Sequence, residues 1–321
     1  MIISASAPSN IALIKYMGKS DANVNQPTNS SFSYTLESLR SFVEISLSSE
    51  QVDEWAPLKR ESLQDIEMSE TAIARYLKHF SNLKSRWGIK GCYLVRSANN
   101  FPGDCGLASS ASSFAALTLA SARLAEHYGH EALHTVDLAE LSRQGSGSSC
   151  RSFFGPWVLW SGSSIRPMEM PFGRLQHLVV VASSEKKQVA SSQAHQRVLT
   201  SPLFEGRPAR AEARLAQLLM AFRQEQWSEL FNIVWSEFWD MHALFETSRP
   251  PFGYFEAATS EILSELRKLW LNSKDGPLVT MDAGANVHLL FREDQGELRQ
   301  QIKTHWQKRL QVFDEEMVNK A

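Results

Sequence analysis

The segment with the most chemical content is residues 101–116, FPGDCGLASSASSFAA, a Pro/Gly loop that runs directly into small residues able to begin a helix. Short Ser and Ala side chains let a ligand approach the backbone. The first turn of a helix also presents free N–H groups and the positive end of its dipole. This pattern predicts a seat for an anion, with a nucleotide phosphate as the natural occupant. The same letters are typical of an ordinary loop capped by serine, so that interpretation stays open on this segment alone.

A second polar cluster lies near the N-terminus, in SNIALIKYMGK. Lys15 and Lys19 are four residues apart, and Tyr16 follows the first lysine. Two ammonium groups and a phenol are able to grip a phosphate chain. A pair of surface lysines is the commoner explanation in general, but the otherwise apolar NIALIKY favours a functional interpretation here.

Two further clusters are rich in glycine. In residues 145–152, GSGSSCRS, glycines and hydroxyls flank Arg151, whose rigid guanidinium suits a carboxylate or a phosphate. A flexible linker uses the same letters without needing the arginine. In residues 280–286, TMDAGAN, Asp282 ends a strand and Gly284 lets the backbone turn toward a ligand. On that segment alone, an ordinary turn former is the favoured interpretation.

The periodicity of apolar residues predicts the elements that must position these clusters. Alternation over 31–36 and 43–47 predicts a sheet-rich first ninety residues, and the anion loop leads into a helix over about 109–128, closed by Gly129. Strands and helices without strict alternation predict an α+β fold. The other expected elements are helices at 136–144, 208–226, 228–245 and 255–271, strands at 157–160, 177–181, 278–281 and 287–291, and a final amphipathic helix carrying Leu298, Ile302, Trp306 and Leu310.

Length and composition limit the class of protein. At 321 residues the chain exceeds the usual single-domain size, so we expect two lobes with a cleft between them. A hydrophobic fraction of 43% and a charged fraction of 21% are typical of a soluble globular protein, and no apolar run approaches the roughly 18 residues of a membrane span. The N-terminus lacks the pattern of a secretory signal, which favours the cytoplasm. A net charge of −2 does not indicate nucleic acid.

In combination, these segments resemble the GHMP family of small-molecule kinases, in particular its diphosphomevalonate decarboxylase branch. The motifs that carry the resemblance are SAPSNIALIKYMGK, PTNSSFSYTL, NNFPGDCGLASSASSFAAL, GSGSSCRSFFG and MDAGAN, in the family's order and at about its spacing. The resemblance covers nearly the whole chain. It implies a two-lobed α+β fold, with an N-terminal ATP-binding lobe at 1–172, a C-terminal lobe at 173–321 and a central cleft.

The resemblance also implies an activity. Such enzymes bind ATP with Mg2+, phosphorylate the tertiary 3-hydroxyl of mevalonate diphosphate, and release phosphate and CO2 to leave isopentenyl diphosphate. By this resemblance Asp282 faces the 3-hydroxyl, Arg151 holds the departing carboxylate, and Lys15 holds the diphosphate or the developing charge. The implied partner is a phosphorylated small molecule, with neither nucleic acid nor membrane, and related enzymes are often homodimers.

The remaining site residues are carried over from the same motifs. The resemblance implies a set of substrate-binding residues: Tyr16, Lys19, Ser146, Ser148 and Ser191. It implies a set of nucleotide-binding residues, with Ser109 also the Mg2+ contact: Gly106, Leu107, Ala108, Ser109 and Ser110. Asn10 and Asn25 lie in matching segments. Independently of the resemblance, the position of His242 on a helix near the expected cleft predicts that it packs there or supports a residue that contacts a ligand.

Several positions depart from the family's usual pattern. Met17 stands where tryptophan is usual, Asp104 lies in the phosphate loop, and Ser192 and His195 replace a basic or long residue and a methionine. Because these positions touch ligands, two alternatives stay open: an enzyme of the same fold acting on a singly phosphorylated mevalonate, or one that stops at 3-phosphorylation. A third, a nucleotide-binding module that has lost catalysis, is disfavoured by the retained acid and arginine.

Overall fold

One long strand, β4 (Ser31–Leu47), is the spine of the first main sheet. The computed structural model describes residues 1–64, 66–101, 109–185 and 187–314. In this part of the chain β4 pairs along one edge with β1 (Ile2–Ile14), and along its other edge with β6 (Tyr93–Asn99) and β7 (Trp157–Ser161), all antiparallel. Three shorter pieces complete this region: β5 (Glu54–Pro57) beside β6, β8 (Ser164–Met168) beside β7, and a hairpin of β2 (Lys19–Asp21) and β3 (Gln26–Pro27).

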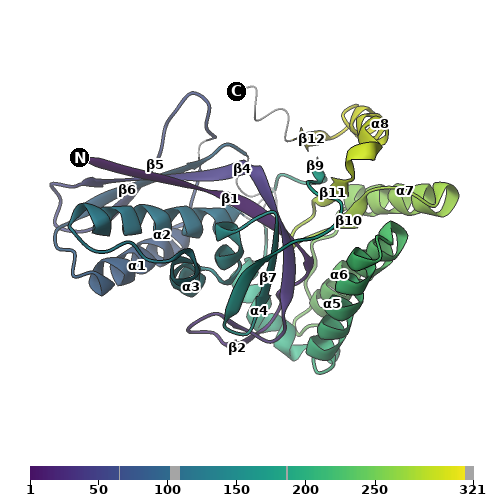
Figure 1. Cartoon of the computed structure of the whole chain (residues 1–321), viewed down its shortest axis with the longest axis horizontal. Helices are drawn as coiled ribbons and strands as arrows, with labels where there is room; N and C mark the ends of the chain where they lie inside the picture. The colour runs from purple at the N-terminus through teal and green to yellow at the C-terminus, as the bar shows by residue number, and fades with distance from the viewer. Residues whose placement is uncertain (65, 102–108, 186, 315–321) are drawn as a thin grey trace.

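Helices α1 (Glu70–Arg86), α2 (Ser109–His127) and α3 (Thr135–Gly145) lie together beside this sheet (Figure 1). The alanines of α2 allow it to pack closely on β1 and β4, where it buries a cluster of small and aromatic side chains. The helix predicted over 109–128 is therefore confirmed, as is the one predicted over 136–144. A short 3-10 turn, η1 (Gly147–Phe153), follows α3 and carries the GSGSSCRS motif.

The second main sheet is antiparallel, in the order β10-β11-β9-β12. Its strands are β9 (Gln176–Val181), β10 (Leu278–Thr280), β11 (Val287–Phe291) and β12 (Gln311–Asp314). The helices of this half are α4 (Ser191–Arg197), α5 (Arg207–Arg223), α6 (Trp227–Glu246), α7 (Ala257–Ser273) and α8 (Gly296–Trp306), the last four of which Figure 1 shows on the right. Two 3-10 turns, η2 (Val198–Thr200) and η3 (Glu293–Gln295), precede α5 and α8. Among the helices of the described residues, none has both the length and the apolar character needed to cross a membrane.

The predicted C-terminal helix is partly wrong. Leu298, Ile302 and Trp306 belong to α8, but the helix ends at Trp306 and Leu310 lies in the turn that follows. The chain then forms β12, which pairs antiparallel with β9 and was not predicted. Leu310 extends the helical apolar period by one step, and that period does not reveal a strand whose partner lies far back in the sequence.

The two sheets share one hydrophobic core. Phe32 and Trp157 of the first sheet stack with ring centroids 5.4 Å apart, and Trp157 meets Phe222 of α5 edge-on at 4.9 Å. The same cluster of buried side chains continues through α6 and α7 into β9, β10 and β11. The two halves therefore have a common packed interior, and the predicted division after residue 172 stays a prediction.

A buried ionic cluster joins α5 to α6. The side chains of Arg207 and Glu237 are both fully buried, and Arg207 Nη1 lies 3.0 Å from Glu237 Oε2 and 3.0 Å from Asp240 Oδ2. Arg214 Nη1 also donates to Glu237 Oε2, at 3.0 Å. Charges removed from water are costly unless they are paired and hydrogen-bonded. Removal of either Arg207 or Glu237 alone should therefore destabilise the fold strongly.

We expect Arg207→Ala to lower the free energy of unfolding by about 3–5 kcal/mol, because it leaves Glu237 buried without its main partner. Urea denaturation of the full chain measures this loss. The control is Arg309→Ala, which removes an arginine 51% exposed from its pair with Glu261 and should cost less than about 1 kcal/mol. Equal losses for the two variants would contradict a stabilising role for the buried cluster.

Candidate active site

An ion pair between Lys15 and Asp282 lies where the two sheets meet. Lys15 follows directly on β1, Asp282 lies two residues after β10, and Lys15 Nζ is 2.8 Å from Asp282 Oδ1. A second bond, from Thr280 Oγ1 to the carbonyl of Ala12 at 3.3 Å, holds the two strands together nearby. The lysine side chain is 2% exposed and the aspartate side chain 27%, so the carboxylate is the member of the pair that a ligand can reach.

The backbone of Lys15 is held on both sides. Its N–H donates to Glu237 Oε1 at 2.9 Å, and its carbonyl accepts from Asn29 Nδ2 at 2.9 Å and from Arg207 Nη2 at 3.4 Å. The ionic cluster between α5 and α6 therefore fixes the end of β1 as well as joining the helices. These hydrogen bonds fix the backbone from which the Lys15 side chain extends, and they therefore limit where its ammonium group can lie.

The charges of the pair are set by their surroundings. Burial lowers the pKa of Lys15, and Arg151 adds to this, although Asp282 and Glu237 oppose it. Burial acts to raise the pKa of Asp282, but Lys15, His288 and Arg151 outweigh it, so the pKa of Asp282 lies below its usual value. The aspartate is thus an ionised acceptor at neutral pH, beside a lysine that gives up its proton more readily than an exposed one.

Arg151 belongs to the same site. It is buried in η1, where its Nε donates to Asn10 Oδ1 at 3.2 Å and its Nη1 to Ser31 Oγ at 3.0 Å. Neither bond uses Nη2. Its positive charge contributes to lowering the pKa of both Lys15 and Asp282. The acid and the ammonium that the sequence singled out are therefore in direct contact, and the charge of Arg151 acts on both.

Asn10 connects Arg151 to the serines of the same motif. Its Nδ2 donates to Ser152 Oγ at 2.8 Å and to the carbonyl of Ser148 at 3.3 Å, while its Oδ1 accepts from the arginine. Ser146 is buried, and its carbonyl accepts from Ser149 Oγ at 2.6 Å. Asn10 thus fixes both the arginine and the backbone around the predicted serine ligands.

Tyr16 and Lys19 lie beside the GSGSSCRS motif. The Tyr16 hydroxyl donates to the carbonyl of Asn25 at 3.3 Å, and Lys19 Nζ donates to Asn25 Oδ1 at 2.6 Å. A Cβ at position 147 would lie 2.6 Å from the Tyr16 ring, so only glycine fits there. Burial raises the pKa of Tyr16 and lowers that of Lys19, so the phenol stays neutral.

The other predicted ligands differ in how the structure places them. Ser191 is the exposed first residue of α4, and His195, one turn further along that helix, contacts the Tyr16 ring at a centroid distance of 4.4 Å. Ser109 and Ser110 open α2, where the first turn leaves N–H groups and hydroxyls for an anion. Several predicted positions lie outside the described residues: Asp104, Gly106, Leu107 and Ala108.

The described residues are compatible with ATP and magnesium at the start of α2. No group of three or more His, Cys, Asp or Glu among them is arranged to hold a metal ion. Mg2+ keeps several waters and is often bound through substrate phosphates with one or two protein oxygens, so a serine hydroxyl beside a helix N-terminus suits it.

His242 and three residues that no sequence pattern singled out also shape the site. His242 was expected to pack or to support a contact, and its Nε2–H donates to the carbonyl of Asp282 at 3.2 Å, which holds the turn after β10. Glu237, Arg207 and Asn29 were missed. The available signal was Glu237 itself, an acid at a buried position on the apolar face of α6.

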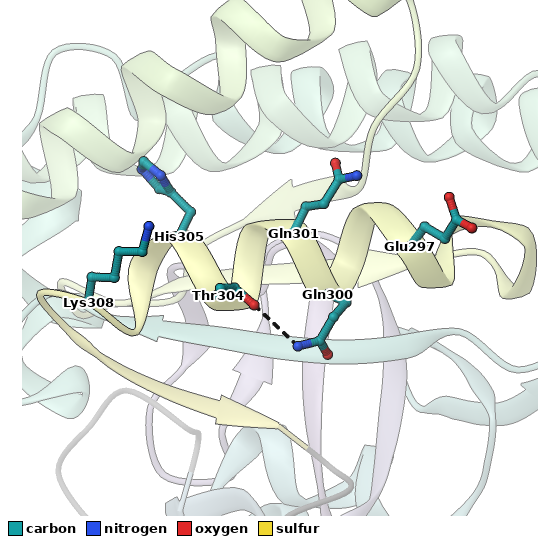
Figure 2. A pocket seen from close by; sticks show the side chains of 6 residues that line it. All are labelled: Glu297, Gln300, Gln301, Thr304, His305 and Lys308. Carbon is teal, nitrogen blue, oxygen red and sulfur yellow. Dashed lines mark hydrogen bonds between the residues drawn. The ribbon is translucent and has the colours of Figure 1, made fainter.

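A hollow along α8 is separate from these groups (Figure 2). Its lining side chains are Glu297, Gln300, Gln301, Thr304, His305 and Lys308. All are exposed; Gln300 Nε2 donates to Thr304 Oγ1 at 3.2 Å, and His305 pairs with Glu265 at 2.9 Å. This is the solvated face of a surface helix, and we assign it no part in the site.

The geometry around Lys15 defines a class of chemistry. An ionised carboxylate can align a hydroxyl group, a rigid guanidinium can hold a carboxylate, and a helix N-terminus can hold the phosphates of a nucleotide. These are the elements of a phosphoryl-transfer site for a small substrate that carries both an alcohol and an acid.

Comparisons with known proteins agree with this class. Two family models match in succession: the diphosphomevalonate decarboxylase-like N-terminal domain over residues 7–166, and the mevalonate 5-diphosphate decarboxylase C-terminal domain over residues 177–319. A diphosphomevalonate decarboxylase from Gibberella zeae is 33% identical, covering 92% of this chain and 82% of the relative. The chain belongs to the diphosphomevalonate decarboxylase family.

Solved structures support the fold. A mevalonate diphosphate decarboxylase from Legionella pneumophila superposes with a TM-score of 0.92 at 46% identity, covering 98% of this chain and 100% of that one. The structure of MDDEF in complex with MVAPP, AMPPCP and magnesium has a TM-score of 0.84 at 28% identity, covering 97% and 96%. The predicted α+β fold of the GHMP kinases is confirmed.

The lowered pKa of Asp282 predicts how the ion pair contributes to stability. Its contribution is complete above the usual carboxyl pKa of 3.8 and is lost as the pH falls through the lower value in the fold. We expect Asp282→Asn to lower the free energy of unfolding by about 1–3 kcal/mol near neutral pH, because the substitution leaves the Lys15 ammonium buried and unpaired. This difference should shrink on acidification below 3.8. Urea titrations at a series of pH values measure it.

The matched control is Glu261→Gln, which removes a carboxylate 47% exposed from its pair with Arg309 and should cost less than about 1 kcal/mol. A loss for Asp282→Asn that grows as the solution is acidified, or no loss at neutral pH, contradicts the ionised pair.

Proposed function

We propose that this chain catalyses the ATP-dependent decarboxylation of mevalonate 5-diphosphate to isopentenyl diphosphate, with release of ADP, phosphate and CO2. The observation that supports it most strongly is the Lys15–Asp282 ion pair, with the charge of Arg151 acting on both members. The family to which the chain belongs carries the same activity in its name. In this reaction a tertiary hydroxyl is phosphorylated first, and loss of the carboxylate as CO2 then expels phosphate.

Asp282 orients the 3-hydroxyl. ATP supplies the phosphoryl group, and Mg2+ offsets the charge of its phosphates. The carboxylate is ionised and partly open to ligand, so it accepts a hydrogen bond from the hydroxyl and directs its oxygen along the line of attack. Lys15 keeps Asp282 ionised and offers a proton donor to nearby negative charge. Little proton abstraction is needed, because phosphoryl transfer depends mainly on alignment and charge stabilisation.

Arg151 positions the carboxylate that leaves as CO2. Two of its nitrogens are fixed by Asn10 and Ser31, so the guanidinium presents one direction to the substrate. A very strong grip on the carboxylate would oppose its loss of charge, so its contribution is alignment of the breaking bond. A kinase that stops after 3-phosphorylation has no need of this group, which is why we favour the decarboxylase over that alternative.

The remaining residues bind the phosphates. Tyr16 and Lys19, with Ser146, Ser148 and Ser191, are proposed to hold the substrate diphosphate. Ser109 and Ser110 at the start of α2 are proposed to hold the ATP phosphates, with Ser109 on Mg2+, together with three positions outside the described residues: Gly106, Leu107 and Ala108. The relatives are named for a diphosphorylated substrate, which disfavours the singly phosphorylated alternative.

The proposal also covers the roles of the two lobes, the location and oligomeric state of the enzyme, and its partners. The N-terminal lobe at 1–172 carries the ATP site and the lobe at 173–321 supplies Asp282, with the substrate between them. The enzyme acts in the cytoplasm as part of isoprenoid biosynthesis, and it forms a homodimer. Its partners are small molecules, with no role for nucleic acid or membrane.

We expect the purified chain, given ATP, Mg2+ and mevalonate 5-diphosphate, to release CO2 and ADP in equal amounts. Mevalonate 5-phosphate in place of the diphosphate should yield far less of both. Asp282→Asn should lower turnover by about 1000-fold while ATP binding survives, because only alignment and proton acceptance are lost. Trapped CO2, coupled ADP detection and nucleotide titration measure the three quantities.

Asp275→Asn is the control and should turn over at the wild-type rate, since that carboxylate lies at the surface in a pair with Arg292. ADP without CO2 would identify a 3-kinase instead. Near-normal turnover of Asp282→Asn would exclude its proposed role.

A further inference from the structure

His195 is a buried histidine whose two ring nitrogens have different surroundings. Its Nδ1 accepts a hydrogen bond from the Gly18 N–H at 3.0 Å. A neutral imidazole that accepts at Nδ1 carries its proton on Nε2, so this bond selects one tautomer. The group that His195 can offer to a ligand is therefore an Nε2–H donor.

The ring is also fixed in orientation. It packs against Tyr16 with centroids 4.4 Å apart, and Tyr16 is itself held by Trp160 at 4.7 Å. Gly18 adopts a φ of +96°, and a Cβ there would lie 2.6 Å from the ring of Phe204. Other residues are excluded at this position, so the backbone N–H that orients His195 is fixed in place.

The charges that act on His195 are all positive. Burial, with smaller contributions from Lys19, Arg151 and Arg75, lowers the pKa of His195 to about 3. These groups belong to β2, η1 and α1. A neutral donor beside Lys19, the residue that follows Gly18, is suited to an anion, since the cation supplies attraction and the donor supplies direction.

We propose that His195 is a specificity-determining residue whose Nε2–H donates a hydrogen bond to a phosphoryl oxygen of the substrate's 5-diphosphate. The proposal rests on the proposed function for the identity of the substrate. Lys19, whose Nζ is held by Asn25 Oδ1 at 2.6 Å, supplies the neighbouring positive charge. His195 acts on binding of the phosphate end and leaves the chemistry at Asp282 unchanged.

The test compares two substitutions at this position. His195→Met keeps similar bulk and removes the donor, whereas His195→Gln keeps an N–H donor and cannot become charged. We expect His195→Met to raise the KM for mevalonate 5-diphosphate about tenfold, as for the loss of one hydrogen bond to a charged group. The kcat should stay within about threefold and the KM for ATP should not change, while His195→Gln should recover most of the lost affinity.

A direct binding measurement separates this proposal from the proposed function. Calorimetry with inorganic pyrophosphate, in the presence of a saturating non-hydrolysable ATP analogue, should show about tenfold weaker binding to His195→Met than to the wild type. The control is His130→Met, an exposed histidine, which should bind pyrophosphate as the wild type does. If the wild type released no CO2, the proposed function would fail while the pyrophosphate titration still tested His195.

Unchanged pyrophosphate affinity in His195→Met overturns the proposal. An equal rise in the KM for ATP also overturns it, because His195 would then support the whole site. A His195→Gln variant as weak as His195→Met does the same, because the N–H donor would not be the group that matters.

Discussion

The candidate site depends on a single ion pair between positions 267 residues apart, which forms where the two sheets meet. Lys15 is almost fully buried, and an isolated ammonium in that position would cost several kcal/mol. Asp282 offsets part of that cost, and Glu237 and Arg207 hold the lysine backbone so that the pair forms only when β1, β10, α5 and α6 are assembled. The chemical site is thus a consequence of closing the two sheets on each other.

The charged side chains of the site have different roles. The acid is ionised because a lysine and an arginine lower its pKa, and the arginine is held by neutral oxygens of Asn10 and Ser31. A site built this way is organised before the substrate arrives, so little reorganisation is needed as charge develops in the reaction. Burying these charges lowers the stability of the fold. The large shared core of aromatic and aliphatic side chains offsets that loss.

Local patterns predicted much of the fold, whereas the resemblance to a known family, and not the composition of any single motif, singled out Lys15, Arg151 and Asp282. The helix over 109–128 and the pair formed by α5 and α6 were confirmed, because each has a clear apolar period and clear ends. The strand β12 and the end of α8 were not predicted, since pairing with β9 depends on contacts remote in sequence. Glu237 and Arg207 were missed for the same reason: their task is to hold the backbone of Lys15, and no local motif records that contact.

The proposed reaction requires Lys15 and Asp282 to act as one unit. A double-mutant cycle on the rate of CO2 release tests it most directly, with Lys15→Met, Asp282→Asn and the double variant compared with the wild type. Residues that act as a unit are strongly non-additive, so the double variant should be about as slow as the slower single variant. If the two losses multiply, the residues act independently and the account of the site is wrong.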